Sequence, residues 1–230
     1  MQRNIHIKVC GITNIIDRDL VIAAGADYFG TILDVPSSPR SIDIPRAAIL
    51  FSTRDIKRVA VVVNSEPQRV RKIIDVLHPD AIQLHGSETP EFVRDILKET
   101  RATLWKAIHI PVPMDEPPRV FEDLQRSITE FYNSGIRTFL LDTVIKQRGQ
   151  EQRGGTGKTF DWNLLERLPR LSDVRYVVAG GVTPENVRSL LGISVVGGVD
   201  ANSGVELFPG KKDAVRIRKL MAEIRNPESS

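Results

Sequence analysis

Two side chains that can move protons stand at the ends of apolar, strand-like runs. Cys10 is the only cysteine among the 230 residues, and Gly11 follows it directly. A lone cysteine is commonly a buried structural residue, whereas a thiolate at such a position could act as a base or a nucleophile. Asp142 ends the run TFLLD. A desolvated carboxyl group there could be a general acid, unless it only caps a helix or forms a salt bridge.

Groups that bind anions stand at comparable places. Arg40 lies in SSPRS (37–41), and its planar guanidinium suits a substrate carboxylate, although an exposed, solvated arginine is the simpler interpretation. Gly180-Gly181 precedes a Thr-Pro-Glu helix start, and Ser203-Gly204 follows the last strand-like run. Glycine lets backbone N–H groups approach an anion, and a helix N-terminus favours negative charge. These turns therefore predict phosphate binding, with plain tight turns as the alternative.

The segment GGTGKT (154–159) ends like a nucleotide-binding P-loop, but that pattern needs a glycine at the position of Gln152. A long polar segment, rather than a strand, precedes it. We therefore expect Gly154 and Gly155 to hinge a mobile lid over a binding site, and the alternative is a plain solvated loop.

Two histidines also stand near the ends of apolar runs. His85 and His109 have no third ligand of matching type nearby in the sequence, so they predict no metal site. We expect His85 to line the substrate site or to support a lining residue. Strand alternation is expected to point Lys8 away from the position beside Cys10, which leaves the role of Lys8 open.

Near-continuous apolar runs alternate with amphipathic segments, the pattern of parallel strands covered on both faces by helices. The predicted strands span 5–10, 27–33, 58–64, 81–85, 104–110, 138–142, 175–181 and 194–200. The predicted helices span 15–24, 67–78, 89–100, 120–132, 161–168, 184–191 and 212–224, with 44–54 as the least regular.

Eight such units predict an α/β protein with a single (β/α)8 TIM barrel over residues 1–225 and a frayed tail at 226–230. A doubly wound open sheet is the alternative, but it would begin with a glycine-rich turn, which GITN (11–14) is not. In a barrel the carboxyl ends of all strands share one rim, so the thiol, the carboxyl group, the guanidinium and the glycine turns would meet there.

The bulk composition excludes several classes of protein. Lys and Arg number 32 against 29 Asp and Glu, and a formal net charge of +3 is too even for an electrostatic nucleic-acid binder. One cysteine cannot form an intramolecular disulfide. No apolar run approaches the ~18 residues of a spanning helix, and no secretory signal is evident. We therefore expect a cytoplasmic protein without membrane or nucleic-acid partners, either a monomer or a homodimer.

Eight blocks in chain order resemble the phosphoribosylanthranilate isomerase family. They are KVCGIT (8–13), SPRS (38–41), AIQLHGSETPE (81–91), LLDT (140–143), GGTGKTFDW (154–162), AGGVTPENV (179–187), GVDANSGVE (198–206) and PGKKD (209–213). The resemblance implies a cofactor-free and metal-free isomerase of tryptophan biosynthesis, catalysing the third step from chorismate. It would convert the phosphorylated substrate N-(5-phosphoribosyl)anthranilate to 1-(2-carboxyphenylamino)-1-deoxyribulose 5-phosphate by an Amadori rearrangement.

The resemblance also implies roles for individual residues. Asp142 would protonate the furanose ring oxygen, Cys10 would take the proton from C2, and Arg40 would hold the anthranilate carboxylate. The phosphate would be held by Gly180, Gly181, Asp200, Ser203 and Gly204. A base at neutral pH should be a thiolate, so we expect the site to lower the pKa of Cys10.

Three alternatives stay open beside this interpretation. An isomerase of a phosphoribosyl aminoimidazole would use two aspartates and a second phosphate turn, but Cys10 ends the first run and no second Gly-Gly turn follows His85. Indole-glycerol-phosphate synthase would need a glutamate at a strand end, and none of the predicted strands ends in one. A sensor of a phosphorylated metabolite would not need Cys10 and Asp142.

Two departures from the family pattern, YFGTILD (28–34) and the long polar segment 143–153, predict a different pocket wall and a longer, more mobile sixth loop.

Overall fold

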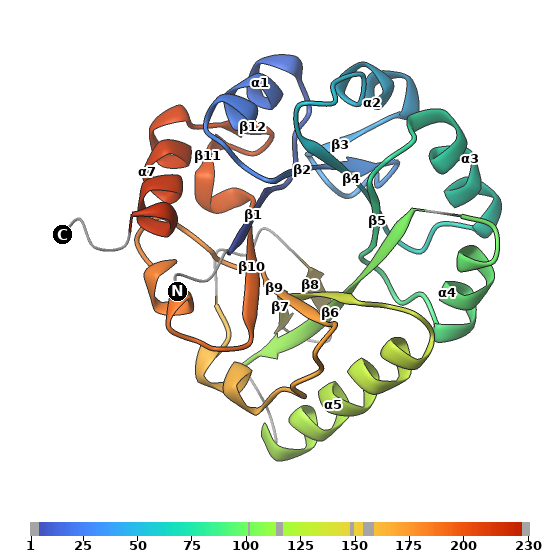
Figure 1. The fold of residues 1–230 in the computed structure, drawn as a ribbon, viewed down its shortest axis with the longest axis vertical. Coiled ribbons are helices and arrows are strands. Elements are labelled where there is room, and N and C mark those ends of the chain that lie inside the picture. Colours follow the sequence, from blue (N-terminus) through green and yellow to red (C-terminus); the bar gives the residue numbers. More distant parts are fainter. Residues whose placement is uncertain (1–4, 101, 114–116, 148–149, 154–158, 227–230) are drawn as a thin grey trace.

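The computed structural model describes residues 5–100, 102–113, 117–147, 150–153 and 159–226. Eight parallel strands form a closed ring with helices outside it (Figure 1). The barrel strands are β1 (His6–Val9), β2 (Tyr28–Leu33), β4 (Lys57–Val62), β5 (Ala81–Leu84), β6 (Thr103–Val112), β7 (Thr138–Gln147), β9 (Arg175–Val178) and β10 (Val196–Ala201). Pairing of β1 with both β2 and β10 closes the ring. The predicted (β/α)8 barrel is confirmed, while the domain limits and the tail at 226–230 stay predictions because 227–230 lie outside the described residues.

Several of the seven described α-helices begin at a residue whose side chain caps them. The seven are α1 (Ile15–Ala23), α2 (Ile44–Leu50), α3 (Pro67–Leu77), α4 (Pro90–Leu97), α5 (Pro117–Asn133), α6 (Arg188–Leu191) and α7 (Ala214–Arg225). The Thr89 hydroxyl accepts from the Phe92 N–H at the start of α4. Even the least regular segment, 44–54, begins as a helix, because Asp43 accepts from the Arg46 N–H and a proline fits the first turn.

The connection after β7 contains additional strand structure, while the predicted mobility of this loop stays a prediction. β7 runs on to Gln147, beyond the predicted end at 142, and β8 (Gln150–Arg153) returns antiparallel to it as a hairpin. The next helix is a 3₁₀-helix, η1 (Trp162–Arg167), and the helix predicted at 184–191 is reduced to the four residues of α6. The smaller elements are β3 (Ser41–Ile42), η2 (Ser203–Val205), β11 (Glu206–Phe208) and β12 (Lys211–Lys212). Gly154 and Gly155, the predicted lid hinges, lie outside the described residues.

Strand alternation divides the buried residues into two layers. Side chains from five different strands meet inside the ring, namely Cys10, Tyr28, Val59, Val61, Ala81 and Trp105. The larger apolar cluster, which includes Ile7, Val9, Phe29 and Leu141, fills the space between the strands and the helices. A third, small apolar cluster consists of Ala107, Leu140, Val177 and Ala179. Buried polar and charged residues, among them Lys8, Asp142 and Asp200, accompany these apolar clusters.

A buried carboxylate fastens the first helix to the last βα unit. Asp17 Oδ1 lies 2.5 Å from Lys211 Nζ, and Asp17 Oδ2 accepts from the Lys212 N–H at 2.9 Å. Burial alone would raise the pKa of Asp17, but these two hydrogen bonds outweigh it and hold the pKa below its usual value. The charge on Asp17 therefore stabilises the contact between α1 and β12.

Replacing Asp17 by Asn should lower the free energy of unfolding at pH 7 by roughly 1–3 kcal/mol, because charge-assisted hydrogen bonds are weakened. The folded-state pKa lies below the unfolded value of about 3.9, so this stabilisation is complete above that value and is lost as the pH falls through the folded-state pKa. Urea midpoints of the wild type and Asp17→Asn should converge in acid. Asp19→Asn, at an exposed carboxylate on the same helix, serves as the control; a gap that stays constant with pH would contradict the role of the Asp17 charge.

Candidate active site

The first strand directs a lysine and the cysteine to the same place inside the barrel. A Cβ atom added to Gly30 of β2 would lie 2.9 Å from Cys10 Sγ and 2.9 Å from Lys8 Cε. Both side chains therefore occupy the space that Gly30 leaves open. The expectation that Lys8 points away from Cys10 is wrong, because residues two apart in a strand share a face.

Lys8 forms a buried ion pair at the seam of the barrel. Its Nζ lies 2.6 Å from Asp200 Oδ2, and the side chains are 1 % and 6 % exposed. Burial alone would lower the pKa of Lys8, but the Asp200 carboxylate reverses this and raises it. Burial also raises the pKa of Asp200, against the opposing effect of Lys8. The second oxygen of Asp200, Oδ1, has no hydrogen-bond partner among the described residues.

The electrostatics of Cys10 differ from the expectation. Burial raises the pKa of the thiol, although the cations Lys8 and Lys212 act to lower it. The expected lowering below the usual value is therefore wrong for this structure. A Cys10 thiolate would form next to the Lys8 ammonium, which acts to lower the pKa of the thiol.

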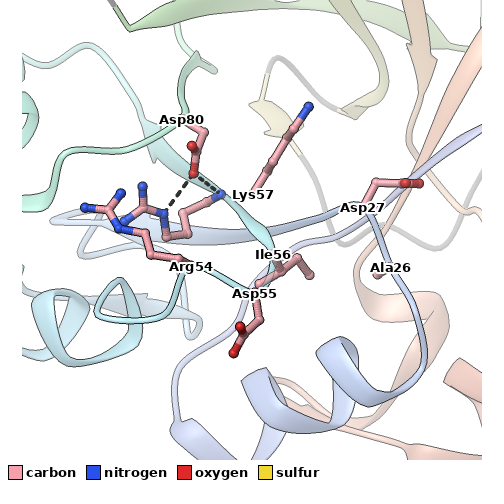
Figure 2. A pocket seen from close by; sticks show the side chains of 8 residues that line it. Ala26, Asp27, Arg54, Asp55, Ile56, Lys57 and Asp80 are labelled. Atoms are coloured by element: carbon pink, nitrogen blue, oxygen red, sulfur yellow. Dashed lines mark hydrogen bonds and ion pairs between the residues drawn. The ribbon is translucent and has the colours of Figure 1, made fainter.

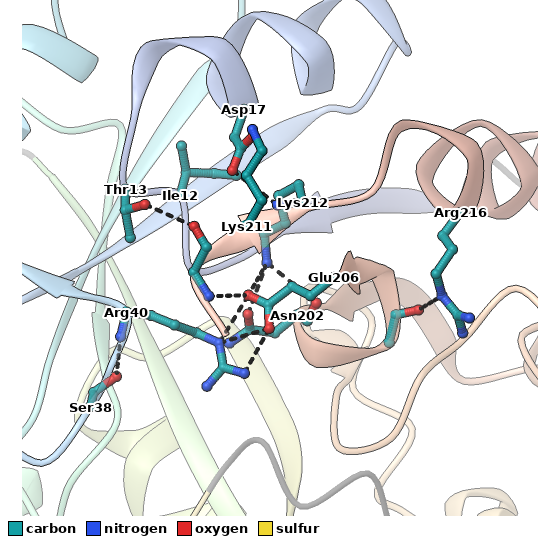
Figure 3. A network of polar contacts seen from close by, with 12 residues as sticks. Ile12, Thr13, Asp17, Ser38, Arg40, Asn202, Glu206, Lys211, Lys212 and Arg216 are labelled. Atoms are coloured by element: carbon teal, nitrogen blue, oxygen red, sulfur yellow. Dashed lines mark hydrogen bonds and ion pairs between the residues drawn. The ribbon is translucent and has the colours of Figure 1, made fainter. Parts of the chain in front are cut away.

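Arg40 belongs to a second charged network, formed between the loop after β2 and the segment after β10 (Figure 3). Arg40 Nε and Nη2 donate to the two carboxylate oxygens of Glu206 at 2.9 and 2.7 Å. Lys212 Nζ lies 2.9 Å from Glu206 Oε1 and 3.0 Å from Asn202 Oδ1. Burial alone would raise the pKa of Glu206, but Arg40 and Lys212 hold it below its usual value. Arg40 is thus not a solvated surface residue, and Glu206 is a site residue that sequence reasoning missed.

Asp142 lies beside a histidine, not at a helix cap. Asp142 Oδ2 is 3.2 Å from His85 Nε2, and Asp142 Oδ1 accepts from the Thr143 N–H at 2.8 Å. The other ring nitrogen of His85, Nδ1, lies 3.0 Å from Gln83 Nε2. Gln83 is also a residue that the sequence analysis missed, although its position two residues before His85 on one strand is a usable signal.

The structure also supplies the third ligand that was not evident in the sequence. His109 and Asp142 are register partners on β6 and β7, and His109 Nε2 lies 3.1 Å from the His85 carbonyl oxygen. One possible ligand atom from each of His85, His109 and Asp142 lies within 4.8 Å of the others. Asp142 thus completes a group of metal-ligating type, which the expectation of no third ligand overlooked.

The predicted phosphate turns pack against each other. Gly180 and Gly181 have φ of 72° and 73°, a region that favours glycine. A Cβ atom at Gly204 would lie 2.0 Å from the carbonyl oxygen of Val182, so the turns after β9 and β10 are in direct contact. Asp200, grouped with these residues by resemblance, instead directs its carboxylate to Lys8 inside the barrel.

The structure has one cavity away from these residues and another whose lining includes His109. One, of about 330 Å³, lies at the amino ends of the strands, where the Arg58 side chain donates to Asp80 Oδ2 at 2.8 Å (Figure 2). The other, of about 520 Å³, is lined by the β5–α4 connection, β6 and α5. It borders the buried pair of Lys106 Nζ and Glu88 Oε2, which are 2.9 Å apart.

Replacing Lys8 by Met should move the ionisation of the Cys10 thiol to higher pH, because a buried cation that favours the thiolate is removed. The chain has one cysteine, so thiolate absorbance near 240 nm measured against pH reports on this group alone. Lys57→Met, at an exposed lysine on β4, is the matched control and should leave the titration unchanged. An unchanged or lower midpoint in Lys8→Met would rule out Lys8 as the group that stabilises the thiolate.

Proteins of known function have a similar sequence and a similar fold. The family model for N-(5'phosphoribosyl)anthranilate (PRA) isomerase matches residues 7–223. The N-(5'-phosphoribosyl)anthranilate isomerase of Rhodopseudomonas palustris (strain BisB5) is 33 % identical over 227 residues, covering 98 % of each chain. A structure of monomers generated from the dimeric enzyme of Thermotoga maritima has a TM-score of 0.76 at 32 % identity, covering 96 % of this chain and 98 % of that one. A phosphoribosyl anthranilate isomerase in complex with reduced 1-(o-carboxyphenylamino)-1-deoxyribulose 5-phosphate has a TM-score of 0.74 at 31 % identity, with the same coverage. The chain therefore belongs to the N-(5'-phosphoribosyl)anthranilate isomerase family.

Proposed function

We propose that Asp142 and Cys10 are the general acid and the general base of the family's reaction. That reaction is the Amadori rearrangement of N-(5'-phosphoribosyl)anthranilate in tryptophan biosynthesis, and the chain is an isomerase of this type. One observation carries the assignment: a buried thiol directly after β1 and a buried carboxyl group on β7 each lie beside an ionisable side chain, Lys8 and His85.

Asp142 acts first, as the acid. Its proton passes to the furanose ring oxygen, the bond from C1 to that oxygen breaks, and the anthranilate nitrogen lone pair forms an iminium with C1. The carboxylate that is left behind faces His85 Nε2 and the Thr143 N–H, at 3.2 and 2.8 Å. These two groups stabilise the charge that Asp142 gains in this step.

Cys10 then acts as the base. Its thiolate removes the proton from C2, and the electrons of that C–H bond form a double bond to C1 while the iminium nitrogen regains its lone pair. Protonation at C1 and loss of the C2 hydroxyl proton complete the ketone. C1 is reduced as C2 is oxidised, so the reaction balances without an external oxidant or reductant. Lys8 holds positive charge beside the thiolate during this step.

The two ends of the substrate bind at different parts of the rim. We assign the anthranilate carboxylate to Arg40, whose guanidinium is held by Glu206. We assign the phosphate to the backbone N–H groups of the turns after β9 and β10, which include Gly180, Gly181, Ser203 and Gly204. Asp200, at the end of β10, is hydrogen-bonded to Lys8. The bound compound in the related structure carries both a carboxyphenyl group and a phosphate, which supports this assignment.

Among the described residues, the side of the barrel across from β9 and β10 offers no comparable place for a second phosphate. The N–H groups of Asn64 and Gly86, after β4 and β5, donate to Glu88 Oε1 and Oε2 at 2.8 and 3.0 Å. A buried carboxylate of the chain itself therefore occupies the donors that a second phosphate would need. This disfavours the bisphosphorylated aminoimidazole substrate.

We also propose a cytoplasmic location, as for other enzymes of biosynthesis, and a monomer or homodimer. No helix among the described residues has the length and apolar character needed to cross a membrane. A lid hinged at Gly154 and Gly155 stays part of the proposal.

Cys10→Ala and Asp142→Ala should each reduce kcat by at least about 10²-fold, the usual effect of losing an acid–base group. The loss of substrate fluorescence on mixing measures turnover, and a stable shift without decay shows that the variant still binds. Asp123→Ala, at an exposed carboxylate on α5, is the control. Near wild-type kcat in either site variant would contradict the role assigned to that residue.

Arg40→Ala should raise KM by about tenfold or more and change kcat less, because a charge-assisted, bidentate contact to the carboxylate is lost. Arg40→Lys keeps the charge but not the planar fork, so it should recover only part of the affinity. Arg69→Ala, at an arginine on α3 paired with Asp34, is the matched control. A large fall in kcat at unchanged KM would place Arg40 at the reacting atoms instead.

A further inference from the structure

We propose that His85, His109 and Asp142 form a binding site for a divalent transition-metal ion, best suited to Zn²⁺, and that the bound ion inhibits the enzyme. The three residues lie on neighbouring strand ends, after β5, on β6 and on β7. Metal binding is inferred from geometry alone, whereas the inhibition also rests on the proposed role of Asp142.

The positions of the three side chains follow from the register of the barrel. His109 and Asp142 are paired directly across β6 and β7, and both are at inward-facing positions of their strands. The ring of His85 lies with its centroid 5.0 Å from that of His109, at an interplanar angle of 86°. All three ligand atoms are within 4.8 Å of one another.

One of these separations already matches that of a zinc site. Zn–N and Zn–O bonds of about 2.0–2.1 Å in a tetrahedron place neighbouring ligand atoms ~3.3 Å apart. His85 Nε2 and Asp142 Oδ2 already lie 3.2 Å apart. His109 supplies the third ligand atom, within 4.8 Å of the other two. A tetrahedral ion with three protein ligands would take water as its fourth ligand.

Both imidazoles also have a partner for the ring nitrogen that would not bind the ion. His109 Nε2 lies 3.1 Å from the His85 carbonyl oxygen, which can only accept, so the neutral ring carries its lone pair on the other nitrogen. His85 Nδ1 faces the Gln83 amide at 3.0 Å, and Gln83 Oε1 is buried without a hydrogen-bond partner among the described residues. When an ion binds, rotation of this amide lets Oε1 accept from Nδ1–H, so that the Nε2 lone pair is available to the ion; without the ion, Nε2–H faces the Asp142 carboxylate. Metal-bound histidines typically have such a second hydrogen bond.

The donor set selects the ion. Two imidazole nitrogens and one carboxylate oxygen suit Zn²⁺ and neighbouring transition metals, and do not suit Mg²⁺ or Ca²⁺, which prefer oxygen ligands. A bound ion occupies Asp142 Oδ2, so this carboxyl group cannot carry the proton for the sugar ring. The ion therefore blocks the proposed protonation of the sugar ring.

Binding is tested on the metal-free full chain with Zn²⁺, by equilibrium dialysis and metal analysis, and with Co²⁺, by its visible spectrum. We expect one ion per chain in the wild type and at least about tenfold weaker binding in His109→Gln, which removes one ligand. His85→Gln removes another ligand and should weaken Zn²⁺ binding equally. It provides the binding test if His109→Gln does not fold. His78→Asn, at an exposed histidine at the end of α3, is the control and should bind as the wild type does. The Co²⁺ spectrum should lack thiolate charge-transfer bands, which excludes Cys10 as the ligand.

The same preparations test inhibition. Zn²⁺ at concentrations that fill the site should abolish turnover of the wild type, and His109→Gln should turn over normally without metal and resist Zn²⁺. Binding that is as tight in both histidine variants as in the wild type would overturn the site. If the metal-free wild type has no isomerase activity, the proposed function fails, and the dialysis result still decides on the metal site.

Discussion

The ion pair between Lys8 and Asp200 is the interaction on which the rest of the site depends. The two residues are register partners on β1 and β10, so the pair lies at the seam where the barrel closes. Removing two charges from water costs several kcal/mol per ion, and attraction between them only approximately offsets that cost. Such a pair is a poor source of stability. Its value lies in a cation that is fixed beside the Cys10 thiol.

Other buried ionisable side chains around the rim are also paired. Arg40 meets Glu206, His85 meets Asp142, and in each case the partner comes from a different βα unit. An unpaired charge would be costly in this dry interior, so each group holds its partner in place. Closure of the barrel therefore assembles the site, because no single unit of the fold contains both members of a pair.

The sequence was sufficient for the fold and for the two residues proposed as acid and base. Continuous apolar runs identify strands covered on both faces, and Cys10 and Asp142 stand at the ends of two such runs. It was not sufficient for the partners of these residues. Glu206 lies 166 residues from Arg40, and its pairing has no local pattern that periodicity could reveal.

Other differences arise from competing effects that a sequence cannot weigh. The polar segment after Asp142 forms the β7–β8 hairpin, in which backbone hydrogen bonds pair the two strands antiparallel. The pKa of Cys10 is raised because burial outweighs two nearby cations, and their relative strength depends on positions in space. The misplacement of Lys8 was avoidable, since the two-residue period of a strand already places it on the face of Cys10.

The site depends on the absence of a Cβ atom at Gly30. A methyl group there would press on both the sulfur of Cys10 and the end of Lys8. A search for catalytic residues that considers only side chains with functional groups would miss Gly30. Yet it decides whether a base and its counter-ion fit side by side, so saturation mutagenesis of this enzyme should find β2 intolerant at a residue that takes no part in the chemistry.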